Sequence, residues 1–329
     1  MADVARRFRE ADRAQLFLVG ALALSVIFIV LAVLLNTAIY TGNIATRDPG
    51  PGAGDVSEYE SAAKSMANHT IVAVNDENNS SYTALQSSFT ETVSNWSDTA
   101  SVHTAATLTD AHVEIVTTEQ GSMVGQEHRD ALTSDNGDGN WTVVNNSSAR
   151  AFRLNVSQSS LLDISVAGVL RNESFYVGFD DGSGEWRTYF YREGTGNVSI
   201  DVVDPSDTQV GSTCSVDPGA DGFTVVKLST ARLGNQSCPA FTQLFENMSG
   251  RYNVSYGNAV NAVGSEKVNG TYSVIVDRPL DRLATGADDT SDEPYAADAM
   301  YSADLKVTYR SSVSYYRVHI RVAPEEPDV

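Results

Sequence analysis

Residues 16–35 read LFLVGALALSVIFIVLAVLL, twenty residues without a charge and with Ser25 as the only polar side chain. A bilayer core about 30 Å thick is crossed by roughly 20 apolar residues in a helix. Because the backbone must satisfy its own hydrogen bonds in lipid, such a stretch is expected to be helical. With its flanks it predicts a transmembrane helix over residues 15–39.

Positive charges lie mainly before this stretch and predict its orientation. Arg6, Arg7, Arg9 and Arg13 precede it, whereas Arg47 alone follows closely. Basic flanks stay in the cytoplasm. Residues 1–14 are therefore predicted to be a cytoplasmic leader. The sequence predicts a single-pass protein of the cell membrane with its C-terminal domain outside the cell.

The leader ends in Arg13-Ala14-Gln15, directly before the apolar run. This segment resembles the site cut by archaeal prepilin peptidases, although Val19 stands where many pilins carry Glu. Residues 12–47, and LKVTYRSSVSYYRVHIRVAPEEP at 305–327, resemble a family of uncharacterised haloarchaeal membrane-anchored surface proteins with a pilin-like N-terminal segment. The resemblance implies leader removal between Ala14 and Gln15 and a helix that packs with other helices. A plain uncleaved anchor remains the alternative.

The charge of the chain is strongly acidic, with 42 Asp and Glu against 22 Lys and Arg and a formal net charge of −20. The first forty residues carry +1, which leaves −21 for the rest of the chain. In concentrated salt the Debye length falls to about 3 Å, so such self-repulsion is tolerated. The composition predicts a halophilic protein and argues against nucleic-acid binding, which needs a basic patch.

Asn-x-Ser/Thr sequons are unusually frequent, and all of them follow the apolar stretch. A single sequon is a weak signal, but this excess and one-sided placement predict an external glycoprotein. The candidate glycosylation sites are Asn68, Asn78, Asn79, Asn95, Asn140, Asn145, Asn146, Asn155, Asn172, Asn197, Asn235, Asn247, Asn253 and Asn269.

The chain has two cysteines, Cys214 and Cys238. Thiols oxidise readily outside the cell, so we predict a disulfide between them. Two cysteines without a nearby His do not form a tetrahedral zinc site.

The remaining sequence divides by composition. A Gly/Pro-rich spacer is expected at 40–55, a helical region at 56–110, a β-rich extracellular domain at 111–323 and a tail at 324–329. Asp55 and Glu58 predict a capping box for a short helix that ends near Ala67. Leu85, Phe89, Val93 and Trp96 form an apolar stripe with helical spacing.

Alternating apolar residues indicate strands from residue 112 onward. Strands are predicted at 112–117, 141–144, 151–156, 197–203, 223–228, 252–256 and 271–277. Hairpins are predicted at 175–190 and 301–322, and a surface loop at 281–295. Asn155 and Asn253 fall on the polar faces of their strands. The fold class is therefore α+β: a transmembrane helix, a short helical region and a mainly antiparallel β-sandwich-like ectodomain.

No motif in the sequence indicates catalysis or a cofactor. The five His residues are scattered, and neither a nucleophile elbow nor a phosphate-binding loop is present. The stretch 135–140, DNGDGN, contains oxygen ligands suited to Ca²⁺ but is more typical of a turn. Residues 127–130, EHRD, and His319 between Arg317 and Arg321 are interpreted as exposed charges.

Two functions remain. In the first, the chain is a pilin-like or pseudopilin-like subunit of a surface filament or secretion assembly. Its membrane helix would then pack with copies of itself or with related subunits. In the second, it is a monomeric, membrane-anchored binding or adhesion protein of the cell envelope. We expect no enzymatic activity in either case.

Overall fold

The computed structural model describes residues 53–77, 81–106, 108–194, 196–248, 250–260, 266–287, 293–312 and 314–327. Residues 53–329 form one compact unit. The predicted leader, transmembrane helix and most of the spacer lie outside the described residues, as do Asn78 and Asn79. Those predictions therefore remain predictions.

Two long helices open the described chain, α2 (Ala53–Glu77) and α3 (Tyr82–Ala105). The prediction that the first helix ends near Ala67 was wrong. The helix also begins two residues before the expected end of the spacer, so Asp55 lies in its first turn. It continues because Ala63, Ala67, Ile71 and Val74 extend one buried stripe at helical spacing.

The second helix forms as its sequence predicts. The Ser81 hydroxyl caps its N-terminus by accepting a hydrogen bond from the Ala84 N–H at 3.3 Å. Leu85, Phe89 and Val93 are buried, which confirms the apolar stripe.

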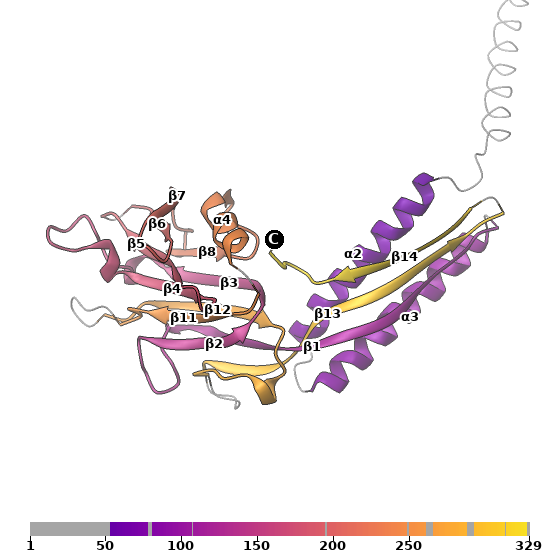
Figure 1. The fold of residues 1–329 in the computed structure, drawn as a ribbon, viewed down its shortest axis with the longest axis horizontal. Helices are drawn as coiled ribbons and strands as arrows, with labels where there is room; N and C mark the ends of the chain where they lie inside the picture. Colours follow the sequence, from indigo (N-terminus) through magenta and orange to yellow (C-terminus); the bar gives the residue numbers. More distant parts are fainter. Residues whose placement is uncertain are drawn as a thin grey trace, which may run out of the picture. The chain divides into compact units, whose positions relative to one another are not determined.

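The strands form two antiparallel sheets, which confirms a mainly antiparallel β-fold (Figure 1). The eight-stranded sheet has the order β10-β9-β8-β3-β12-β1-β13-β14. Its strands are β1 (Asp110–Ala131), β3 (Ala149–Ser157), β8 (Phe223–Lys227), β9 (Arg232–Leu233), β10 (Gln236–Ser237), β12 (Asn269–Val276), β13 (Tyr295–Arg310) and β14 (Tyr315–Val322).

The six-stranded sheet has the order β2-β11-β4-β5-β6-β7. Its strands are β2 (Trp141–Ser147), β4 (Phe175–Asp180), β5 (Glu185–Arg192), β6 (Val198–Val203), β7 (Gln209–Val216) and β11 (Tyr252–Gly257). The short helix α4 (Pro239–Asn247) and the 3-10 turns η1 (Gln158–Ser160), η2 (Arg171–Glu173) and η3 (Leu280–Arg282) complete the elements.

The apolar residues between the two sheets form one core. Phe152 and Val274 enter it from the eight-stranded sheet, and Phe179 and Phe190 enter it from the six-stranded sheet. Helix α4 adds Phe241, Leu244 and Phe245. On β3 the buried Phe152, Leu154 and Val156 alternate with Arg153 and Asn155, as expected for a sheet that buries one face.

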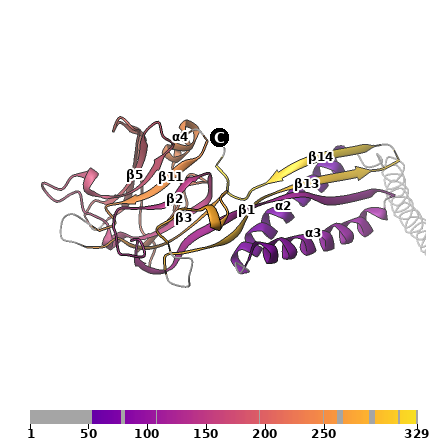
Figure 2. The same ribbon diagram turned by 60° about the horizontal axis from the view of Figure 1, so that its bottom comes forward.

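Strands β1 and β13 are much longer than the sequence pattern suggested, because they serve two cores. Their pairing runs from Asp110 opposite Arg310 to Gly125 opposite Tyr295. At one end of this pair β1 also pairs with β12, and at the other end β13 also pairs with β14. At that second end, α2 and α3 cover one face of β1, β13 and β14 (Figure 2).

The helix-covered layer has its own core. Tyr59 of α2 lies against Trp96 of α3 and Tyr309 of β13, with ring centroids 5.6 and 5.9 Å apart. Asn75 of α2 exchanges two hydrogen bonds with the backbone of Met300, at 2.8 and 3.0 Å. The final hairpin, predicted over 301–322, is confirmed with Arg310 opposite Tyr315.

The predicted loop at 281–295 is corrected at both of its described ends. Residues 280–282 form η3, and Tyr295 already belongs to β13. Residues 288–292 lie outside the described part of the chain.

Candidate functional site

The sequon asparagines are accessible wherever the structure describes them. Asn68, Asn145 and Asn155 are half-buried, and no described sequon asparagine is buried. The exposed ones are Asn95, Asn140, Asn146, Asn172, Asn197, Asn235, Asn247, Asn253 and Asn269.

The two strand asparagines that the sequence placed on polar faces differ. Asn253 is exposed while Tyr252 and Val254 on either side of it are buried, as the alternation predicts. Asn155 lies in the middle of the eight-stranded sheet, opposite Thr271 on β12 and Val225 on β8. Its side-chain oxygen is buried and accepts no hydrogen bond. Asn253 is thus the better placed of the two to carry a sugar.

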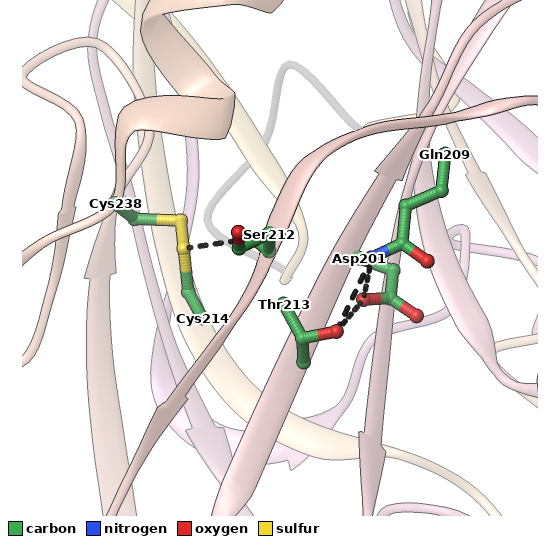
Figure 3. Close-up of a disulfide and its surroundings, with 6 residues drawn as sticks. All are labelled: Asp201, Gln209, Ser212, Thr213, Cys214 and Cys238. Atoms are coloured by element: carbon green, nitrogen blue, oxygen red, sulfur yellow. Dashed lines mark hydrogen bonds between the residues drawn. A yellow bond between two sulfur atoms is a disulfide. The ribbon is translucent and has the colours of Figure 1, made fainter.

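The predicted disulfide between Cys214 and Cys238 is confirmed, with the two Cα atoms 5.7 Å apart. Cys214 lies on β7, and Cys238 is the residue directly before α4 (Figure 3). Cys238 is buried against the apolar core, and Cys214 packs at its margin. The bond therefore joins an edge strand of the six-stranded sheet to the helix that closes the core.

Asp201 of β6 hydrogen-bonds to β7 on the side away from the disulfide (Figure 3). Its carboxylate is buried and accepts hydrogen bonds from Thr213 at 2.6 Å and from Gln209 at 3.1 Å. It also accepts from the Tyr191 hydroxyl at 3.1 Å and from Arg171 at 3.0 Å. Burial, with the Asp201 charge beside it, raises the pKa of Tyr191 to about 12.

This network could not be assigned from sequence patterns, yet it has a signal in the sequence. In VSIDVV, residues 198–203, Asp201 stands in an otherwise buried strand. A carboxylate there needs paired donors to offset its loss of water. All four donors come from other elements, namely η2, β5 and β7, which the fold brings beside β6. The network therefore ties β6 to β5, β7 and η2.

The exposed charges at residues 127–130 pair with residues far away in the chain. His128 Nδ1 lies 2.9 Å from a Glu293 carboxylate oxygen, and the same carboxylate accepts from the Glu127 and His128 N–H groups. Contact with Glu293 raises the pKa of His128. Arg129 pairs with Asp221 at 2.5 Å and stacks over the Phe223 ring. His128 and Arg129 thus pair with two different carboxylates, Glu293 and Asp221.

The stretch at 135–140 forms a turn. Its Asp138 N–H donates to the Ser134 hydroxyl at 3.0 Å, and its Gly137 N–H donates to the Ser134 carbonyl at 2.8 Å. Gly137 has a φ of +82°, a value that glycine adopts without strain. In the described ranges of the chain, no three His, Cys, Asp or Glu side chains gather as metal ligands would.

Several cavities on the described surface, of about 400 to 780 Å³, are large enough for a small molecule. One, of about 780 Å³, is lined by Asp135, Asp281 and Asp298. Asp298 is already occupied, because it accepts from the Gln120 amide at 3.0 Å and from the Tyr82 N–H at 3.2 Å.

Another cavity, of about 500 Å³, is lined in part by Phe245, Met248 and Tyr252. Its polar wall is internally paired, since Glu326 accepts from the Tyr301 hydroxyl at 3.0 Å and from Arg321. It resembles an apolar binding cleft more than a catalytic site.

Within the ranges that the structure describes, no helix is both long and apolar enough to cross a bilayer. No protein-family model, curated protein or solved structure matches the chain.

Proposed function

We propose that the chain is a single-pass cell-surface protein whose β-rich ectodomain lies outside the membrane. The observation that carries the proposal is the uncharged stretch 16–35, with basic residues before it and all fourteen sequons after it. Positive flanks orient membrane helices toward the cytoplasm. The protein acts by binding or assembly and not by catalysis.

Two features of the ectodomain support an external location. The described sequon asparagines are exposed or half-buried, as an oligosaccharide acceptor must be. The disulfide between Cys214 and Cys238 belongs to an oxidising compartment. Protease added to intact cells should remove the ectodomain; protection of the C-terminus with cleavage near Arg6 to Arg13 would reverse the orientation.

The acidic charge supports a halophilic archaeal source. A charge near −21 on residues 41–329 is screened in concentrated salt and repels itself over a longer range in dilute salt. Circular dichroism across a KCl titration should show loss of structure as salt falls. An unchanged spectrum down to about 0.1 M KCl would remove this part of the proposal.

The more specific proposal is a pilin-like or pseudopilin-like subunit. Arg13-Ala14-Gln15 supports it, because cutting after Ala14 removes every charge that precedes the apolar run. Unpaired charges resist leaving water, so their removal favours packing of the helix with copies of itself or with related subunits. Mass spectrometry of the native protein should then find a mature N-terminus at Gln15.

The alternative is a monomeric, anchored binding or adhesion protein. The cleft beside Phe245, Met248 and Tyr252 favours this function, because a pocket lined in part by apolar side chains suits a ligand. A recovered peptide spanning Arg13 to Leu16, together with a monomer in detergent, would select it. Cross-linked ladders with an N-terminus at Gln15 would select the pilin-like subunit.

A further inference from the structure

Apolar side chains with high exposure collect at one end of the helix-covered layer. The two most exposed large apolar residues of the described chain are Leu108, at 88%, and Val102, at 73%. Tyr315 is 58% exposed. Single exposed apolar residues are ordinary on a protein surface, but a group of them marks an interaction site.

Strand pairing and the end of α3 bring these three residues to the same end of the layer. Asp110, Arg310 and Tyr315 form the last row of β1, β13 and β14. Leu108 stands two residues before that row, and Val102 lies in the last turn of α3, which leads into it. Figure 1 shows the end of α3 and the β13–β14 turn at the same end of this layer.

The first turns of α2 lie at the same end. Tyr59 of α2 contacts the Tyr309 ring, one residue before the last row, and Glu60 accepts from the Tyr316 hydroxyl at 2.8 Å. Ala53 is therefore the point at which the chain enters this end of the layer. Residues 1–52, with the apolar stretch 16–35, precede Ala53 in the chain.

Leu108 has a strained backbone conformation, and packing of its exposed side chain does not compensate for that strain. Its φ is +57°, in the left-handed region where glycine and asparagine are usual and a bulky side chain is disfavoured. The N–H of Leu108 donates to the Ala105 carbonyl, and the N–H of Thr109 donates to the Thr104 carbonyl, so the turn ends α3. Neither hydrogen bond uses the leucine side chain, which points into solvent.

The surroundings of this end suit a lipid headgroup layer. Arg317 lies with its guanidinium carbon 5.4 Å from the centre of the Tyr315 ring, and both Arg317 and Arg310 are exposed. Tyrosine and arginine are typical of membrane interfaces, since each has an apolar body and a polar tip. The thirteen residues 40–52 reach at most about 45 Å, which keeps this end at high local concentration beside the bilayer.

We propose that Val102, Leu108 and Tyr315 form a membrane-contact patch that rests on the lipid headgroups beside the anchor. The proposal rests on the proposed membrane anchoring of the chain and adds a defined orientation to it. The layer of α2, α3, β1, β13 and β14 stands on the membrane through this patch. Residues 40–52 keep the layer near the bilayer, and the patch sets the orientation of the layer on it.

The test places one fluorescent label at a time on the full-length protein. Leu108→Cys, Tyr315→Cys and the control Val166→Cys are each labelled without reductant, so that the native disulfide stays closed. Val166 is 54% exposed and lies in the loop after β3. The proteins are reconstituted in vesicles of phosphatidylcholine and phosphatidylglycerol that carry a doxyl-labelled lipid. Labels at 108 and 315 should be quenched about twofold more than the label at 166.

A second variant separates membrane contact from a role in folding. Leu108→Asn suits a positive φ, so it should leave the unfolding temperature unchanged or raise it. The double variant Leu108→Asn with Tyr315→Ser should reduce the quenching of a label at Val102→Cys, compared with the same label in the otherwise wild-type protein. A lower unfolding temperature of Leu108→Asn would show that the leucine serves the fold, which overturns the proposal.

Flotation of the same vesicles distinguishes failure of the membrane-contact patch from failure of the membrane anchor. Protein that floats with vesicles, while labels at 108 and 315 are quenched no more than the label at 166, overturns the patch and leaves the anchor. Protein that does not float overturns the proposed anchoring and the patch with it.

Discussion

The guanidinium of Arg150 donates to the main-chain carbonyl of Pro324, with Nη1 and the oxygen 2.9 Å apart. It also donates to the carbonyls of Met300 and Tyr301, each at 2.7 Å. Arg150 is fully buried, and burial lowers its pKa to about 10, so it remains charged at neutral pH. One side chain thus joins β3, β13 and the C-terminal tail.

Replacing Arg150 with Met should lower the free energy of unfolding by about 3 kcal/mol or more, because the buried carbonyls of Tyr301 and Pro324 lose this donor and that of Met300 keeps Asn75 alone. Guanidinium chloride unfolding of the full-length protein in detergent, followed by circular dichroism, measures this loss. Arg153→Met is the matched control, since Arg153 is exposed on the same strand. Equal stabilities of the two variants would contradict the role given to Arg150.

Asp201→Asn should destabilise the protein by about 2–3 kcal/mol, since an amide replaces a charge that four donors surround. Asp207→Asn is the control. Asp207 is exposed, and its φ of +62° suits asparagine. Thermal unfolding of both variants gives the comparison, and a loss confined to Asp207→Asn would refute the network.

Removal of the disulfide by Cys214→Ala with Cys238→Ala should cost roughly 3 kcal/mol, because the bond closes a loop across a sequence separation of 24. Chemical unfolding of the double variant beside the oxidised wild type measures the cost. Alkylation of the denatured, unreduced wild type should label neither cysteine. Labelling of both would show that the bond is absent from the native protein.

The contact between His128 and Glu293 should depend on pH. The pKa of His128 is raised and that of Glu293 is lowered. The histidine contribution is therefore complete below its ordinary pKa of about 6.5 and is lost as pH rises through the folded value. The Glu293 contribution is present above its ordinary pKa and is lost in acid.

Histidine NMR should show His128 titrating with a midpoint above about 6.5. Glu293→Gln should bring the midpoint down, whereas Glu246→Gln on the distant helix α4 should leave it unchanged. An identical midpoint in wild type and Glu293→Gln would rule out the contact in solution.

Sequence patterns predicted most of the strands and the second helix correctly, because local alternation and helical spacing mark a buried face. Leu85, Phe89 and Val93 lie on such a stripe, and Tyr252 and Val254 lie on either side of Asn253 as expected. The same patterns placed the end of α2 too early and missed α4 and the polar edge strand β7. A strand with five exposed residues, such as β7, has no apolar alternation to reveal it.

By itself, the sequence determined the disulfide pair, since the chain offers each cysteine no other partner, and the antiparallel β-class, since alternation is a local property. Only the tertiary structure decided what surrounds Arg150, Asp201 and Leu108. Arg150 and Leu108 are ordinary residues in the sequence, and Asp201 stands out only as a charge in a buried strand. Their surroundings come from segments distant in the chain: Pro324 for Arg150, Arg171 for Asp201, and the row of Arg310 and Tyr315 that begins two residues after Leu108 at Asp110. Pairing between strands far apart in the sequence brings those segments together, and the local sequence around each residue does not encode that pairing.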